Sequence, residues 1–307
     1  MNRLETEIAG VVFKNPVMPA SGTFEINDYT QSFLDPKKLG ALINKTVFLK
    51  HRAGNKPPRI AETACGVLNS VGIPSEGIDY FLEHTLPLLK SFGTPLVVSV
   101  GGNSLEEFRT IGKIVSDTGE ADLIELDLSC PNMEDGSIWA AEDEKLHKVV
   151  ETVKDVSAVP IITKLSPQVS DIGKTAKIAE DAGADAISLI NTFPGIKIDV
   201  KKGSPILGNI IGGLSGPAIL PLAVYAVWQV YESVDLPIIG MGGISSVESA
   251  LEMVMAGASA VSVGMYNFVD PAIMGKLIDE LETYITANKI ESFAELVGMA
   301  HSPQLSI

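Results

Sequence analysis

Cysteine is scarce in this chain: Cys65 and Cys130 are the only two among 307 residues. Two thiols cannot form the disulfide framework of a small secreted protein. They also cannot hold an iron–sulfur cluster, which takes four cysteine ligands. We therefore expect a reducing, cytoplasmic location and no cluster carried by this chain itself.

Several other features are also absent. The four histidines, His51, His84, His147 and His301, show no metal-like spacing, so no metal site is expected. Lys and Arg total 23 against 38 Asp and Glu, a net charge of −15, which makes nucleic acid an improbable class of partner. No apolar run approaches the roughly 20 residues of a membrane span. The first ten residues are polar and lack the apolar centre of a signal peptide.

Short apolar segments recur along the chain and indicate buried strands. Three of them have a proline as their second residue: 94–100, 159–165 and 236–242. Two others begin with an Ala-Gly-Ala motif, at 182–188 and 256–262, where the glycine suits the left-handed residue that ends a helix. Together with 16–20, 40–47 and 121–128, these segments make eight predicted strands.

Stretches with helical spacing separate these strands, at 104–116, 143–156, 172–182, 218–234 and 246–256. Eight such strand–helix units predict an α/β protein with a (β/α)₈ barrel, as one domain over residues 1–307. A doubly wound sheet is the alternative, but its glycine-rich fingerprint after the first strand is missing. Residues 3–15 are expected to form a hairpin below the barrel. Residues 50–78 and 193–215 are expected to be insertions that enlarge the active-site face.

Cys130 directly follows the apolar run Leu123–Leu128, where a barrel strand gives way to a loop. Catalytic groups of barrel enzymes lie at that end of the strands. A thiol there can act as a base if its proton transfer is well placed, or it can simply pack in the core. The position alone leaves both readings open.

Glycines, lysines and amides near other predicted strand ends suggest a ligand. Gly242, Gly243 and Gly264 follow the last two strands, where barrels often bind phosphate, and 212–216 could add donors. A lysine inside a barrel mouth, as expected of Lys45 and Lys164, must face an anion or an electron-rich cofactor. The amides of Asn69, Asn132 and Asn191 could converge on a cyclic diamide.

Taken together, the motifs resemble those of the class 1 dihydroorotate dehydrogenases, and within them the catalytic subunit of class 1B. The matching segments run in order nearly end to end: 15–16, 19–22, 44–46, 58–63, 69–72, 129–132, 164–167, 190–192, 212–217 and 240–243. The resemblance implies a flavin barrel that oxidises (S)-dihydroorotate to orotate in pyrimidine (UMP) biosynthesis. It implies Cys130 as the base for the C5 proton, while the C6 hydride passes to flavin N5.

The resemblance also implies which residues hold the ligands. Substrate would be bound by Lys45, Asn69, Ser70, Val71, Gly72, Ile73, Asp127, Asn132, Asn191 and Thr192. FMN would be bound by Ala20, Ser21, Lys45, Thr46, Ser99, Asp127, Lys164, Ile190, Gly216, Gly242, Gly243, Gly264 and Met265. A homodimer is implied as well, with FAD and an iron–sulfur cluster on a separate electron-transfer subunit and no membrane partner.

Some positions depart from the family pattern. Ser99 and Asp127 stand where the family has asparagine, and Met265 stands where it has Thr or Ser. An ionised aspartate only accepts hydrogen bonds and would repel the substrate carboxylate. Asp127 could be protonated, could face Lys45 or Lys164, or could mark a different dihydropyrimidine-like substrate. A non-catalytic flavin-binding barrel is a further alternative.

Overall fold

The structure is a computed structural model that describes residues 2–128 and 139–302. Eight parallel strands form one sheet in the order β3-β16-β15-β10-β9-β8-β7-β4. Their bounds are β3 (Val17–Pro19), β4 (Leu42–Ile43), β7 (Leu96–Val100), β8 (Leu123–Asp127), β9 (Ile161–Lys164), β10 (Ala186–Leu189), β15 (Ile238–Met241) and β16 (Ala260–Val263). The outer strands meet where the Gly40 N–H donates to the Val17 carbonyl at 2.9 Å. The (β/α)₈ prediction is thus confirmed, and the doubly wound alternative is wrong.

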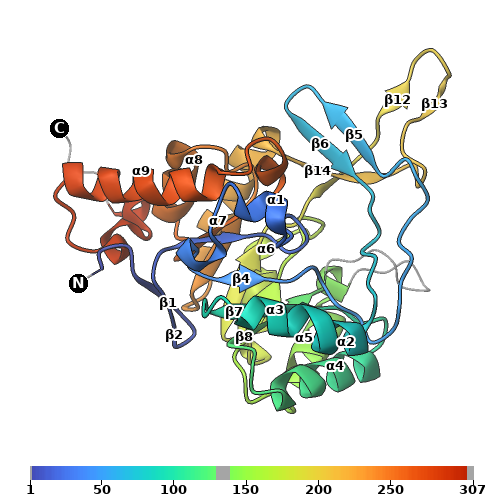
Figure 1. Cartoon of the computed structure of the whole chain (residues 1–307), viewed down its shortest axis with the longest axis horizontal. Helices are drawn as coiled ribbons and strands as arrows, with labels where there is room; N and C mark the ends of the chain where they lie inside the picture. Colours follow the sequence, from blue (N-terminus) through green and yellow to red (C-terminus); the bar gives the residue numbers. More distant parts are fainter. Residues whose placement is uncertain (1, 129–138, 303–307) are drawn as a thin grey trace.

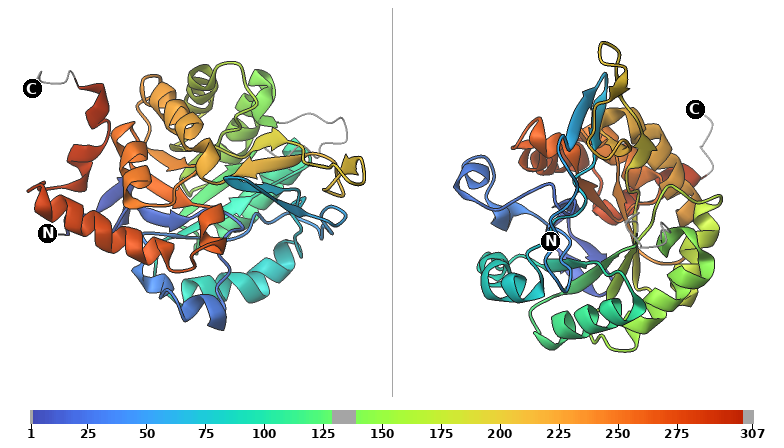
Figure 2. Two further views of the ribbon diagram at one scale, coloured as in Figure 1. Left: turned by 90° about the horizontal axis from the view of Figure 1, so that it is seen from above. Right: turned by 90° about the vertical axis from the view of Figure 1, so that its right-hand side faces the viewer.

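Helices surround the strands, as Figure 2 shows. The longer ones are α4 (Leu105–Asp117), α5 (Asp143–Lys154), α6 (Ile172–Asp181), α7 (Leu220–Tyr231), α8 (Val247–Met255) and α9 (Ile273–Ala287). Shorter turns are α1 (Asp28–Gln31), η1 (Pro36–Lys38), α2 (Ile78–Tyr80), η2 (Phe81–Thr85), α3 (Leu86–Lys90), η3 (Trp139–Ala141), η4 (Pro217–Ile219), η5 (Met265–Phe268), η6 (Phe293–Leu296) and η7 (Met299–His301). Ser104 and Ser246 cap α4 and α8 through their side chains. Gly183 and Gly257 follow α6 and α8 with φ of +99° and +127°, as their sequence context predicted.

The N-terminal hairpin closes the bottom of the barrel. Its strands are β1 (Thr6–Ile8) and β2 (Val11–Phe13). Ile8 and Phe13 are fully buried in one apolar cluster with Val97 and Ile162, which lie near the amino ends of β7 and β9. The predicted hairpin is therefore part of the barrel core.

The two insertions form one antiparallel sheet. Its order is β11-β14-β6-β5, with bounds β5 (Ile60–Thr63), β6 (Gly66–Asn69), β11 (Phe193–Gly195) and β14 (Gly212–Ser215). A small hairpin, β12 (Ile198–Asp199) with β13 (Ser204–Pro205), extends from it. In Figure 1 this sheet projects from the side of the molecule opposite both chain termini. Because the insertions follow β4 and β10, the sheet stands at the carboxyl ends of the barrel strands, where an active site is expected.

Among the described residues, no helix is both long and apolar enough to cross a membrane.

Candidate functional site

The inside of the barrel changes from apolar to polar toward the carboxyl ends of its strands. Side chains two residues apart on a strand share a face. The lower inward positions Val97, Leu123, Ile162 and Ala186 are apolar and form the cluster that contains the hairpin. Two residues further on, the same four strands carry Ser99, Glu125, Lys164 and Ser188, all at most 6% exposed. A buried polar layer thus lies directly above the core.

Glu125 is the centre of this layer. Its Oε2 accepts a hydrogen bond from Ser188 Oγ at 2.9 Å, and its Oε1 accepts one from Ser99 Oγ at 3.2 Å. Lys164 Nζ lies 3.8 Å from Oε1. A buried carboxylate needs such partners, because losing its hydration is strongly unfavourable.

Lys164 stays charged in this setting. Burial by itself lowers the pKa of its ammonium, but the carboxylates of Glu125 and Asp127 and the hydrogen bond to Glu125 outweigh burial, so the pKa is raised. The sequence predicted Lys164 as a site residue and missed Glu125. The available signal was a carboxylate within the apolar run Leu123–Leu128, two residues before Asp127 and therefore on the same face.

Asp127 ends β8 and lies beside Lys164 in the register of β8 with β9. Its Oδ2 accepts a hydrogen bond from Thr46 Oγ1 at 3.1 Å. The Thr46 hydroxyl also lies 3.0 Å from Ser99 Oγ and 3.1 Å from Ser21 Oγ. Five residues predicted to contact the cofactor are therefore brought together from five neighbouring strands.

Lys45 stands at the rim of the barrel. Its side chain is exposed and packs over Gly22. If Gly22 carried a Cβ, that atom would lie 3.5 Å from Lys45 Cγ. Partial burial lowers the pKa of Lys45, Glu25 raises it, and Arg59 lowers it again, with a net decrease. Lys45 is therefore a cation at the mouth, separate from the buried Lys164.

Two residues predicted to bind substrate meet through the insertion sheet. Asn69 Nδ2 donates to the Gly213 carbonyl at 3.3 Å across β6 and β14. A Cβ on Gly213 would collide with the Thr192 side chain, so Thr192 lies directly against the same glycine. Asn191 Oδ1 accepts a hydrogen bond from the Thr192 N–H at 2.7 Å, which fixes the turn after β10.

The loop after β6 is hydrogen-bonded to Asn55, which lies near the start of the same insertion, residues 50–78. Ser70 Oγ accepts a hydrogen bond from Asn55 Nδ2 at 3.0 Å, and the Val71 carbonyl accepts one from the Asn55 N–H at 3.1 Å. Gly72 has φ of +77° and approaches Asn55 so closely that a side chain would not fit. Ile73 also has a positive φ, +44°, which is unusual for a β-branched residue. The loop is thus fixed in one conformation beside Asn69.

Glycine main chains converge from three loops at the other side of the mouth. Gly242 and Gly243, with φ of +127° and +78°, pack against the first turn of α7, and a Cβ on Gly243 would lie 2.7 Å from Leu220 Cα. Gly216 precedes η4 with φ of +105° and touches the Met265 side chain. Gly264 has more space around it. A Cβ placed on Gly264 would have only the Ala20 Cβ within 4 Å among the described residues, at 3.8 Å. Ile190 Cγ2 lies 3.5 Å from the Cβ position of Gly242.

This arrangement fits the phosphate of the FMN that the resemblance implies. Bare main-chain N–H groups at a helix start form an anion site, and no acidic side chain belongs to this set of residues. Lys164 supplies the buried cation that a flavin ring could face.

Cys130 and Asn132, predicted as the base and as a substrate ligand, lie outside the described residues. Within the described parts of the chain, no group of three or more His, Cys, Asp or Glu side chains could hold a metal ion.

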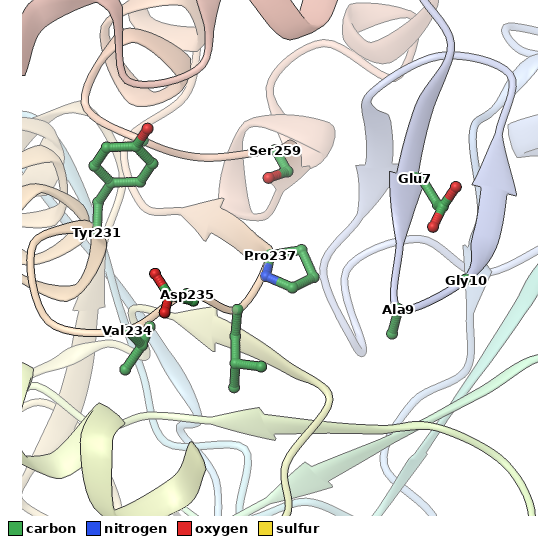
Figure 3. Close-up of a pocket in the computed structure, with 10 residues that line it drawn as sticks. Glu7, Ala9, Gly10, Tyr231, Val234, Asp235, Pro237 and Ser259 are labelled. Carbon is green, nitrogen blue, oxygen red and sulfur yellow. The ribbon is translucent and has the colours of Figure 1, made fainter. Parts of the chain in front are cut away.

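A separate hollow lies at the opposite end of the barrel, between the turn of the β1–β2 hairpin and the segments that lead into β15 and β16 (Figure 3). Glu7, Tyr231, Asp235 and Ser259 are among its lining residues. None of the residues predicted to bind substrate or cofactor lines this hollow. The polar layer and the glycine loops therefore mark the candidate site.

Known proteins similar to this chain agree in family. A family model described as dihydroorotate dehydrogenase matches residues 3–285. A relative from Carboxydothermus hydrogenoformans, named dihydroorotate dehydrogenase B (NAD(+)), catalytic subunit, is 47% identical over 299 residues, 97% of each chain. A protein of the same name from Desulforudis audaxviator is 47% identical over 296 residues, 96% of each chain. Another from Porphyromonas gingivalis is 44% identical over 300 residues, which are 97% of this chain and 98% of the relative.

Proposed function

Because this chain belongs to the dihydroorotate dehydrogenase family, we propose that it is the catalytic subunit of a B-type dihydroorotate dehydrogenase, a CH–CH oxidoreductase of pyrimidine biosynthesis. The observation that carries the proposal is the pairing of a buried lysine with glycine-lined loops at one barrel mouth. An anionic flavin cofactor needs both features, a cation by its ring and main-chain donors at its phosphate.

The proposed cofactor is FMN, within a single domain over residues 1–307. Gly216, Gly242, Gly243 and Gly264 would hold the phosphate. Ala20, Ser21, Thr46, Ser99, Lys164, Ile190 and Met265 would line the remainder. Held by these residues, FMN would supply the acceptor for the hydride that leaves C6 of dihydroorotate.

The chain's own residues position the substrate and move one proton. Asn69, Asn191 and Thr192 approach the mouth from the insertion sheet and the β10 turn, and amides suit the two N–H and C=O edges of the ring. Lys45, a cation at the rim, would attract the substrate carboxylate. Cys130 would take the proton from C5 as the general base.

Electrons would leave through another polypeptide. The relatives are named catalytic subunits of NAD(+) enzymes. This chain has two cysteines, too few for an iron–sulfur cluster. We propose a partner subunit that carries FAD and the cluster, bound to a homodimer of this chain in the cytoplasm.

A ring without the carboxylate is the second candidate substrate, because an acidic residue, Asp127, stands at the end of β8. Anaerobic addition of each candidate to the FMN-loaded protein distinguishes them. Dihydroorotate is expected to bleach the oxidised flavin rapidly. Bleaching by a neutral dihydropyrimidine alone would contradict the named substrate, and bleaching by neither would favour a non-catalytic barrel.

The role of Cys130 is tested by substitution. Cys130→Ala is expected to slow flavin reduction by about 10³-fold, as expected for loss of a general base, while FMN stays bound. Cys65→Ala is the matched control, since Cys65 is the other cysteine and is exposed in the β5–β6 turn. Equal rates in the two variants would exclude Cys130 as the base.

A further inference from the structure

A hydrogen bond inside the barrel crosses the strand that carries Lys164. Ser188 on β10 lies beside Lys164 on β9 in the register of these strands, and β9 separates β10 from β8. Ser188 Oγ nevertheless donates to Glu125 Oε2 on β8, at 2.9 Å. On the other side, Ser99 Oγ on β7 donates to Glu125 Oε1 at 3.2 Å. The carboxylate of Glu125 is therefore fixed by hydroxyls from two other strands.

This fixed carboxylate is the ion-pair partner of Lys164. Glu125 Oε1 lies 3.8 Å from Lys164 Nζ, and both side chains are buried. A lysine ammonium stands on a flexible four-carbon stem, so a neighbouring charge that is itself fixed restricts where the ammonium lies. The buried layer thus holds one cation in a defined place beneath the mouth.

Glu125 also keeps Lys164 charged. Among the described residues, the charges that raise the pKa of Lys164 are those of Glu125 and Asp127, both on β8, whereas its neighbour Ser188 on β10 is uncharged. Burial is the strongest influence on this pKa and lowers it, the attraction of Glu125 comes next, and that of Asp127 is weaker. Without Glu125, burial would outweigh Asp127, and the pKa of Lys164 would fall below its ordinary value of 10.5.

We propose that Glu125 is a positioning residue for the cofactor: fixed by Ser99 and Ser188, its carboxylate holds the Lys164 ammonium beneath the mouth as a cation for the flavin ring. This inference rests on the proposed function, in which FMN occupies the mouth and Lys164 lies by its ring. In this role Glu125 acts through Lys164. The consequence is that Lys164 stays an ammonium, and its contribution to FMN binding stays constant, at neutral and mildly alkaline pH.

The test measures how the affinity for FMN changes with pH. FMN is titrated into the full-length apoprotein, and the quenching of its fluorescence gives the dissociation constant for the wild type and for Glu125→Gln, which keeps the side-chain shape. Between about pH 6 and about pH 9.5, the ratio of the variant's dissociation constant to that of the wild type is expected to rise by about tenfold. The reason is that Lys164 of the variant loses its proton, and a neutral amine binds the ring less strongly than an ammonium. A ratio constant within twofold would overturn the proposal.

Ser188→Ala is the matched control, because it perturbs the same buried layer but leaves both Glu125 and Lys164 charged. Its ratio to the wild type is expected to be the same at every pH. Lys45 at the rim and the phosphate of FMN titrate alike in all these proteins and cancel in the ratio. A rise equal to that of Glu125→Gln would show general damage to the layer and overturn the proposal.

A second background shows whether Glu125 acts through Lys164. In Lys164→Arg the guanidinium stays charged at every pH tested. Adding Glu125→Gln to Lys164→Arg is therefore expected to give a ratio, relative to Lys164→Arg alone, that does not rise with pH. A rise of about tenfold in this background would contradict a role through Lys164.

If Glu125→Gln does not fold, the wild type still tests the proposal. Lysine labelled with ¹³C at Cε reports its own ionisation by NMR, and the Lys164 signal is the one absent in Lys164→Arg. This signal is expected to remain that of an ammonium up to pH 10.5, the ordinary lysine value, and loss of the proton at lower pH would overturn the proposal. If the wild type takes up no FMN, the proposed function fails and this inference fails with it. FMN binding with a constant ratio refutes the inference alone.

Discussion

At the scale of single residues, the site depends on a few buried charges that need one another. Glu125 is 2% exposed and Lys164 is 6% exposed, so neither is solvated by bulk water. Removing one member of such a pair leaves the other as an uncompensated buried charge, which is far less favourable than removing both.

Lys164→Met is therefore expected to lower the free energy of unfolding by about 3–5 kcal/mol at neutral pH, whereas Glu125→Gln with Lys164→Met should lower it by less. Denaturant unfolding of each variant, with and without added FMN, measures these free energies of unfolding. The pKa of Lys164 is raised, so its stabilising charge is fully present below its unfolded value of 10.5 and is lost only as pH rises through the higher folded value. A double variant as unstable as Lys164→Met would contradict the pairing.

Among the helices and strands, those that stabilise the barrel and those that form the candidate site lie at opposite ends of it. The hairpin packs against the amino ends of the strands, while the insertion sheet follows their carboxyl ends. A defect in the hairpin should therefore weaken the fold and spare the site, because the two are at opposite ends of the same strands.

Phe13→Ala removes a fully buried ring from the bottom cluster and is expected to destabilise the protein by about 3–5 kcal/mol. The rate of flavin reduction by dihydroorotate, measured well below the melting temperature, should change by less than about twofold. Val12→Ala is the control, because Val12 is the neighbouring residue on β2 and is 50% exposed. A large loss of rate in Phe13→Ala with no change in stability would disprove this separation.

The insertion sheet shows what local patterns do not encode. Residues 50–78 and 193–215 are each recognisable as insertions, but nothing within either stretch specifies that β6 pairs with β14. That pairing brings Asn69 against Gly213, which is 144 residues further along the chain, and Thr192 lies against the same glycine.

For the molecule as a whole, the proposed function makes this chain one half of an electron path. It carries two cysteines, too few for an iron–sulfur cluster, so the proposed transfer of electrons to NAD(+) needs a partner subunit. We expect the purified, FMN-loaded chain to oxidise dihydroorotate with an artificial acceptor such as dichlorophenolindophenol and to give no measurable NADH.

Steady-state assays measure the rate of dihydroorotate oxidation with each acceptor. They are repeated after addition of a candidate FAD and iron–sulfur subunit. Addition of the subunit should restore NADH formation. Efficient NAD(+) reduction by the isolated chain would show that no partner is needed.

The repeated strand–helix order is encoded locally in the chain, because a buried parallel strand requires a short apolar run and its connection requires a helix. It also placed Lys164, Gly242 and Asp127 at strand ends, since position along a strand fixes the end of the barrel on which a residue lies. Which side chains contact one another depends on the folded arrangement of the barrel. Glu125 with Lys164, Thr46 with Asp127 and Asn69 with Gly213 are all contacts between separate strands or loops. Such contacts depend on how the sheet closes and on how the insertions pair, which no single segment of the chain specifies.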